Sequence, residues 1–142
     1  MRPIVTIADT TDGLPAAFDA IFAPYGGIAN VIPAGSKVHL KPNGVHFSVG
    51  VYTDPAVLDA LLAYLSDHGY NRLALMENCT QGVSTRLVFE VNGYVGIARR
   101  HNAELIYLDE GGTVPYTLED EEVPIRIPRR LYESFIDPSR RS

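Results

Sequence analysis

The sequence predicts a three-layer αβα fold with a mostly parallel sheet and a C-terminal antiparallel hairpin. Short apolar segments alternate with segments of helical periodicity, which is the pattern of right-handed strand–helix–strand crossovers. Residues 73–76 and 105–108 are apolar without alternation, as in strands covered on both faces. With 142 residues and no linker-like segment, we expect a single α/β domain over residues 1–142.

The first strand is predicted at residues 4–8, a short β-branched run. Asp12 is expected to cap the following helix, in which apolar residues recur at helical spacing. Residues 37–40 predict the second strand. The first 40 residues are therefore interpreted as one strand–helix–strand unit.

The clearest helix begins at Asp54-Pro55. Aspartate is a favoured capping residue, and proline suits the first helical position. Five apolar residues then form one broad face, and Gly69 stands where a left-handed residue usually ends a helix. This helix is expected to connect the second strand to the apolar strand at 73–76.

The second half of the chain continues the alternation of helices and strands and ends in a predicted antiparallel pair of strands. Ser84 is expected to cap a short helix through Val91, and residues 94–101 predict a second one. After the strand at 105–108, residues 114–118 and 123–127 are expected to form an antiparallel pair around an acidic turn.

Composition limits the classes of function. Hydrophobic residues make up 46% and charged residues 20%, as in globular proteins, and the net charge of -5 argues against a nucleic-acid partner. No stretch reaches the ~20 apolar residues of a membrane span. The single cysteine, Cys79, cannot form an internal disulfide or hold an iron–sulfur cluster. We expect a cytoplasmic protein without a membrane partner.

Polar residues follow the ends of several predicted strands. In an open parallel sheet, ligands bind beyond the carboxyl ends of the strands. If these strands are neighbours, their trailing residues share one edge, which we call the rim. Glu77 lies at this edge, and the candidate ligand-binding residues there are Lys41, Asn43, Thr53, Asp54, Asn78, Thr85 and Asp109.

Lys41 and Glu77 are also the candidate catalytic residues. A lysine that leaves a strand can neutralise a carboxylate or phosphate, and Glu77, at the end of an apolar strand, can act as a general base. Asn43 can donate and accept hydrogen bonds at once. The alternative is structural: Asn43 caps a turn, and Lys41 pairs with Glu77 or Asp54.

Two further chemistries are weaker alternatives. Cys79 has no histidine beside it in sequence, which argues against a nucleophilic thiol. The histidines lack the spacing of a metal-binding pair on a helix, so we assign no metal ligands. A metal-dependent hydrolase would have to use His46, Glu77 and Asp109. No glycine-rich phosphate loop follows residues 4–8.

Several segments together resemble the family called domain of unknown function 362. They are Val-His-Leu-Lys-Pro-Asn at 38–43, Thr-Asp-Pro at 53–55, Glu-Asn at 77–78, Thr-Arg-Leu-Val-Phe-Glu at 85–90 and Ala-Glu-Leu-Ile-Tyr-Leu-Asp at 103–109. The resemblance covers residues 36–110 and extends more loosely to 137. Each tripeptide alone is weakly specific, and their combination is more so.

The resemblance implies an α/β fold and, because family members are often linked to ferredoxin-type segments, a redox or cofactor-related role. The residues that match the family's polar positions are Lys41, Asn43, Thr53, Asp54, Glu77 and Thr85. Two departures stand out. The family usually has Gly-Asp at 77–78, and it continues past residues 136–137 into another strand. The chain is thus a shortened member, a fragment or a half that needs a partner.

The function expected from the sequence is binding of a small molecule or cofactor, with an anionic group at the rim. Whether the protein is an enzyme, and which cofactor it uses, stays open. The main alternative is an assembly module that pairs with another chain or with a second copy, using residues 131–136, which are apolar enough to dock.

Overall fold

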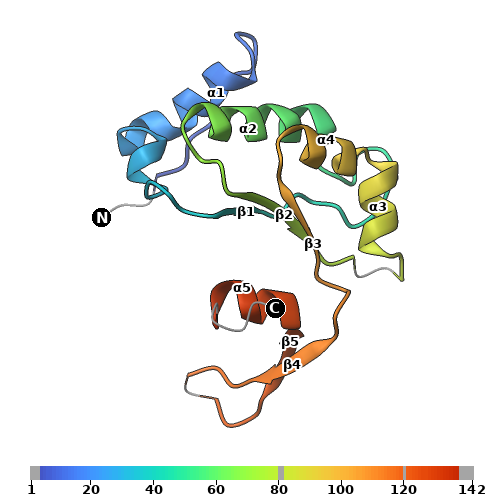
Figure 1. Cartoon of the computed structure of the whole chain (residues 1–142). Helices are drawn as coiled ribbons and strands as arrows, with labels where there is room; N and C mark the ends of the chain where they lie inside the picture. The colour runs from blue at the N-terminus through green and yellow to red at the C-terminus, as the bar shows by residue number, and fades with distance from the viewer. Residues whose placement is uncertain (1–3, 80–81, 120, 138–142) are drawn as a thin grey trace.

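The computed structural model describes residues 4–79, 82–119 and 121–137. These residues form a mixed α/β fold with a three-stranded parallel sheet and a two-stranded antiparallel sheet (Figure 1). The elements are α1 (Leu14–Phe22), two 3-10 turns η1 (Ala23–Tyr25) and η2 (Ile28–Asn30), β1 (Val38–Leu40), α2 (Pro55–Asp67), β2 (Leu73–Glu77), α3 (Thr85–Val91), α4 (Tyr94–Arg100), β3 (Glu104–Tyr107), β4 (Thr113–Tyr116), β5 (Ile125–Pro128) and α5 (Arg129–Phe135).

The parallel sheet has the order β1-β2-β3, as the alternation of strands and helices predicts. Leu40 pairs with Leu75, and Glu77 pairs with Tyr107. All five residues of β2 are buried because this central strand is covered on both faces. Because β1 and β2 are parallel neighbours, their C-terminal ends lie side by side at the same edge of the sheet. The residues that follow these ends form the rim.

One face of the sheet is covered by α1, α2 and α4 (Figure 1). Leu58, Leu62 and Leu65 of α2 are 0–2% exposed and pack with Leu75 of β2 and Phe89 of α3. This cluster is the main core, and it confirms the apolar face that the periodicity of α2 predicts.

The opposite face carries a smaller core. Ala74, Met76, Ile106 and Leu108 form a second buried cluster, and Leu131 of α5 packs against it. α5 is therefore the third layer. The sequence suggested this segment only as a docking element, and the structure uses its Leu131 internally.

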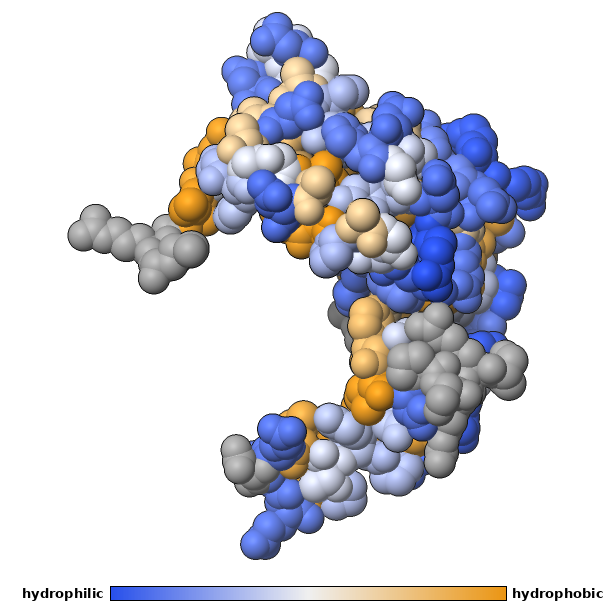
Figure 2. Space-filling view, turned by 60° about the vertical axis from the view of Figure 1, so that its left-hand side comes forward, coloured by the Kyte–Doolittle hydropathy of each residue, from blue (hydrophilic) through white to orange (hydrophobic). Residues whose placement is uncertain are grey.

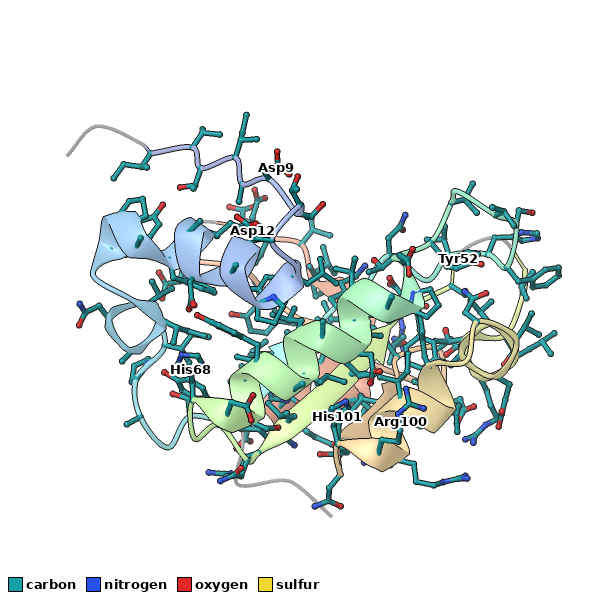
Figure 3. The ribbon with its side chains drawn as sticks, turned by 90° about the horizontal axis from the view of Figure 1, so that it is seen from above. Asp9, Asp12, Tyr52, His68, Arg100 and His101 are labelled. Carbon is teal, nitrogen blue, oxygen red and sulfur yellow. The ribbon has the colours of Figure 1, made fainter. Side chains whose placement is uncertain are left out.

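The ends of α2 match their sequence signals. Asp54 Oδ1 accepts the N–H of Ala56 at 2.7 Å, Pro55 is the first helical residue, and Gly69 has φ +86°. Tyr52 and His68 mark the two ends of this helix in Figure 3. The prediction for α1 is wrong: Gly13, not Asp12, precedes the helix, and no side chain caps it.

The predicted first strand at residues 4–8 is also wrong, because these residues form no strand. Val5 and Ile7 are 87% and 92% exposed. Figure 3 shows this segment, which leads to Asp9 and Asp12, along the flank of α1 that faces away from α2. A strand needs a neighbour for its backbone hydrogen bonds, and the described part of the chain supplies residues 4–8 with none.

The C-terminal hairpin is confirmed, with bounds shifted by one or two residues: Thr113 pairs with Pro128 and Tyr116 with Ile125. Together with α5 it lies below the parallel sheet in Figure 1, and Figure 2 shows an open C with a hollow between this part and the helices above. No helix among the described residues is both long and apolar enough to cross a membrane.

Candidate functional site

Lys41 and Glu77 meet at the rim, as the strand order predicts. Lys41 Nζ lies 2.7 Å from Oε1 and 2.9 Å from Oε2 of Glu77. The Glu77 side chain is 1% exposed, whereas that of Lys41 is 60% exposed. The buried carboxylate therefore fixes one side of the ammonium group, and the other side faces solvent.

Two backbone donors complete the surroundings of the Glu77 carboxylate. Oε1 accepts the N–H of Asn78 at 2.8 Å, and Oε2 accepts the N–H of Gly44 at 3.2 Å. A buried carboxylate needs such partners, since an unpaired one is strongly destabilising. Both oxygens are thus engaged, which supports a positioning role for Glu77. Its role as a general base stays a prediction.

Gly44 comes close to the core at this point. A Cβ atom there would lie 3.3 Å from Cε1 of Phe89 and 3.6 Å from Cγ of Glu77. A side chain at this position would press on the Phe89 ring, so glycine lets the backbone come close enough to donate to Glu77 without displacing that ring. The glycine after Lys-Pro-Asn therefore has a steric reason, which the sequence alone did not reveal.

Asn43, Thr53 and Asp54 form the base of the loop between β1 and α2. The N–H of Asn43 donates to Oγ1 of Thr53 at 2.9 Å, and the N–H of Thr53 donates back to the carbonyl of Asn43 at 2.8 Å. The Asn43 amide also donates to the carbonyl of Val51 at 3.0 Å. These contacts support the structural interpretation of Asn43, with Asp54 as a helix cap.

The loop base is anchored to α4 by Tyr94. Its hydroxyl donates to the carbonyl of Thr53, and its ring is completely buried. Burial raises the pKa of this phenol to about 12. The hydroxyl therefore stays protonated at neutral pH and remains a donor to the loop.

Thr85 and Asp109 meet at the start of α3, next to Cys79. Oγ1 of Thr85 accepts the N–H of Cys79 at 2.9 Å, and Oδ2 of Asp109 accepts the N–H of Thr85 at 2.9 Å. Asp109 thus caps α3 from the end of β3. Ser84, which the sequence predicts as the cap, makes no capping hydrogen bond.

Cys79 is buried beneath the loop that follows β1. Its thiol lies 2.9 Å from the carbonyl oxygen of Gly44 and 3.2 Å from that of Val45. Burial raises the pKa of the thiol, because a desolvated thiolate is unfavourable, and the nearby Glu77 and Asp109 act in the same direction. The thiol is in its neutral form at pH 7 and suits packing better than attack.

The contacts of the His46 ring are with neighbouring residues of its own loop. Its Nδ1 lies 2.8 Å from Oγ of Ser48, and its ring stacks on Phe47 at 4.2 Å between centroids. Across residues 4–79, 82–119 and 121–137, no group of three or more His, Cys, Asp or Glu side chains is arranged to hold a metal ion. His46 is thus not gathered with Glu77 and Asp109.

A cavity of about 400 Å³ lies elsewhere, along β3 and beside α5. None of the predicted rim residues lines it. Arg86 and Glu110 form a two-point ion pair at one end, with the guanidinium 4.3 Å above the ring of Tyr107. The lining residues are Lys37, Arg86, Glu104, Leu105, Ile106, Tyr107, Glu110, Gly111, Arg130, Glu133 and Ser134.

Sequence reasoning missed this cavity because its walls come from five separate parts of the chain. Lys37 and Glu104 form an ion pair across the sheet, although 67 positions separate them in the chain. The one available signal was Arg86, in the first turn of the predicted helix that follows the strand at 73–76.

Comparisons with known proteins give one match. The family model described as Domain of unknown function (DUF362) matches residues 38–136, which include β1 through α5. Searches of curated proteins and of solved structures found no match. The matched segment holds every residue of the predicted rim.

Proposed function

The chain belongs to the DUF362 family, and from that premise we propose that it binds a small anionic ligand at the rim through Lys41. The observation that carries this proposal is the asymmetry of one ion pair. The Glu77 carboxylate is 1% exposed, while the Lys41 side chain is 60% exposed. A ligand approaching from solvent therefore meets the ammonium group before the carboxylate.

The negative charge of the Glu77 carboxylate is stabilised by more donors than Lys41 alone. Its oxygens accept hydrogen bonds from the backbone of Gly44 and Asn78 in addition to Lys41. Charge on the carboxylate is thus partly offset without the lysine, and the solvent side of the ammonium group keeps donors for a carboxylate or phosphate oxygen. In this proposal Lys41 contacts the ligand and Glu77 holds Lys41 in place.

The remaining rim residues support the shape of the site. The reciprocal contacts of Asn43 and Thr53 fix the chain directly after Lys41, and Asn78 is half-buried beside Glu77. In this proposal none of the other three contacts the ligand: Asp54 and Asp109 cap helices, and the Thr85 hydroxyl accepts the N–H of Cys79.

The test is ligand-induced thermal stabilisation with a panel of phosphate, pyrophosphate and small dicarboxylates. Ligand that binds only the folded state raises the melting temperature. We expect wild type to respond to at least one anion, and Lys41→Ala to lose that response. Arg99→Ala is the matched control, because it removes an equal charge from another exposed position. An equal response in wild type and Lys41→Ala would refute the proposal.

A second candidate function is assembly with another chain or a second copy. The observation that favours it is the open C of Figure 2, together with apolar side chains on its lower part: Val123, Phe135 and Ile136 are 73%, 55% and 41% exposed. Exposed apolar side chains mark contacts with a partner where they gather in one patch. Sedimentation over a range of concentrations tests self-association directly, and a strict monomer would contradict that form of it.

We also propose a cytoplasmic location. The single thiol of Cys79 is buried and free, which suits a reducing compartment. Fractionation of cells that express the full chain would test this location.

A further inference from the structure

We propose that the free edge of β3 binds residues 4–8 of a second copy of this chain as an added β-strand, so that two copies exchange these segments. The inference rests on the second candidate function, assembly, and names the surface that would carry it. It does not depend on ligand binding at the rim.

The exposed edge of β3 follows from the hydrogen-bond pattern. The N–H of Leu108 donates to the carbonyl of Glu77 at 3.0 Å, which fixes which residues of β3 face β2. Alternate residues of a parallel strand turn their backbone groups to opposite sides, so Leu105 and Tyr107 face outward. The carbonyl of Tyr107 accepts the N–H of Glu110. Three outward groups remain without a partner among the described residues: both groups of Leu105 and the N–H of Tyr107.

The cavity of about 400 Å³ is lined by all four residues of β3. Its charged walls are already paired, since Lys37 contacts Glu104 and Arg86 contacts Glu110. The cavity therefore offers backbone donors and acceptors with little net charge. That combination favours an extended, uncharged segment, which adds to an exposed strand edge through its main chain.

Residues 4–8 have the matching properties. They read Ile-Val-Thr-Ile-Ala, are mostly β-branched and carry no charge. Val5 and Ile7 are 87% and 92% exposed, and Oγ1 of Thr6 is buried without a hydrogen-bond partner among the described residues. Five extended residues span ~17 Å, enough to cover the four residues of β3.

The donor has to come from a second copy. The segment leads into α1, which packs against α2, and Figure 3 shows it on the far flank of α1. β3 is at the opposite edge of the sheet from β1. Reciprocal exchange would give a closed dimer with two identical contacts, the commonest form of symmetric assembly.

The experiment is sedimentation velocity of the full chain at several concentrations, with variants of each surface. We expect wild type to dimerise and Ile7→Lys to weaken the dimer about tenfold or more, because a desolvated charge would enter the contact. Val49→Lys is the matched control, since Val49 is also 92% exposed but lies in another loop. It should leave the dimer unchanged.

The acceptor is tested by Leu105→Pro, which removes an outward N–H and leaves the ladder to β2 intact. We expect it to weaken the dimer as well. If it does not fold, Ile7→Lys still decides, because its side chain is exposed in the single copy. A dimer insensitive to Ile7→Lys would overturn this inference alone. A strict monomer would overturn both it and self-association, and a monomer with hydrogen-exchange protection at residues 4–8 would show docking within one copy.

Discussion

The ammonium nitrogen of Lys41 lies within 2.9 Å of both carboxylate oxygens of Glu77, although 36 positions separate the two residues. They meet because each follows or ends one of two neighbouring parallel strands, β1 and β2. The pair combines a buried anion with an exposed cation. At this end of the sheet, a charged group that faces solvent is therefore held by a carboxylate in the protein interior.

The energetic coupling of this pair can be measured by a double-mutant cycle. We expect Lys41→Met, Glu77→Gln and the double variant to give a coupling of about 1–2 kcal/mol in urea unfolding, because Glu77 is buried. The exposed pair of Arg100 and Asp59 is the control; Figure 3 shows Arg100 at the surface of α4. It should give less than ~1 kcal/mol. Similar couplings for the two pairs would contradict a special role for burial.

Gly44 and Gly96 form a matched pair of glycines. A Cβ at Gly44 would lie 3.3 Å from the ring of Phe89, whereas at Gly96, within α4, it would meet only the end of Arg100 at 3.9 Å. We expect Gly44→Ala to destabilise the protein by about 1–3 kcal/mol through overpacking. Gly96→Ala should stabilise it by about 0.5–1 kcal/mol, as in other helices.

Thermal unfolding of the two glycine variants, followed by circular dichroism, checks the opposite signs. If Gly44→Ala is as stable as wild type, the loop after β1 can move away from Phe89. The hydrogen bond from Gly44 to Glu77 would then be less important than its position suggests.

The helix α3 should depend on a cap from outside its own segment. Asp109 accepts the N–H of Thr85, while Ser84 makes no capping bond. We therefore expect Asp109→Ala to cost about 1 kcal/mol and Ser84→Ala to be nearly neutral. Urea unfolding of both variants distinguishes these values. A larger loss for Ser84→Ala would restore the cap that the sequence predicts.

Local sequence signals were sufficient where both partners are close in the chain. Asp54, Pro55 and Gly69 fix the ends of α2 by side-chain and backbone preferences that need no tertiary contact. The meeting of Lys41 and Glu77 also followed, because parallel strands place their carboxyl ends on one edge. The parallel sheet and the position of the rim could therefore be predicted from the sequence.

Local sequence signals gave wrong or no predictions where the structure of a segment depends on residues far away in the chain. Residues 4–8 have strand composition, yet a strand needs a neighbour, and the described chain offers them none. Asp109 replaces Ser84 as the cap of α3 because the end of β3 comes to lie beside Thr85. The cavity on β3 likewise joins Lys37, Arg86 and α5, and no pattern in the sequence relates those positions.

The Cys79 thiol provides a prediction about pH. Burial raises its pKa above the ordinary value of 9.0. The unfolded chain therefore loses this proton at a lower pH than the folded protein does. The stability that the buried neutral thiol contributes is complete below the unfolded pKa and is lost as the pH rises toward the folded pKa.

We expect the free energy of unfolding of wild type to fall more steeply above pH 9 than that of Cys79→Ala. The comparison should stop near pH 10. Above that pH, Tyr64 and Tyr94, whose pKa values are raised to about 12, also lower the free energy of unfolding of both proteins as the pH rises. Urea unfolding at closely spaced pH values measures the two slopes. Parallel slopes would mean that the folded protein releases the thiol proton as readily as the unfolded chain.

The same burial predicts slow alkylation. Iodoacetamide reacts with the thiolate, and Cys79 is 8% exposed with its Sγ held near two carbonyl oxygens. At pH 8 we expect labelling of the folded protein to be at least about tenfold slower than labelling in urea, as followed by mass spectrometry. Since Cys79 is the chain's single cysteine, the rate reports on this site alone. Equal rates would show that the loop after β1 opens faster than the reagent reacts, and the rim would then be a mobile surface rather than a fixed one.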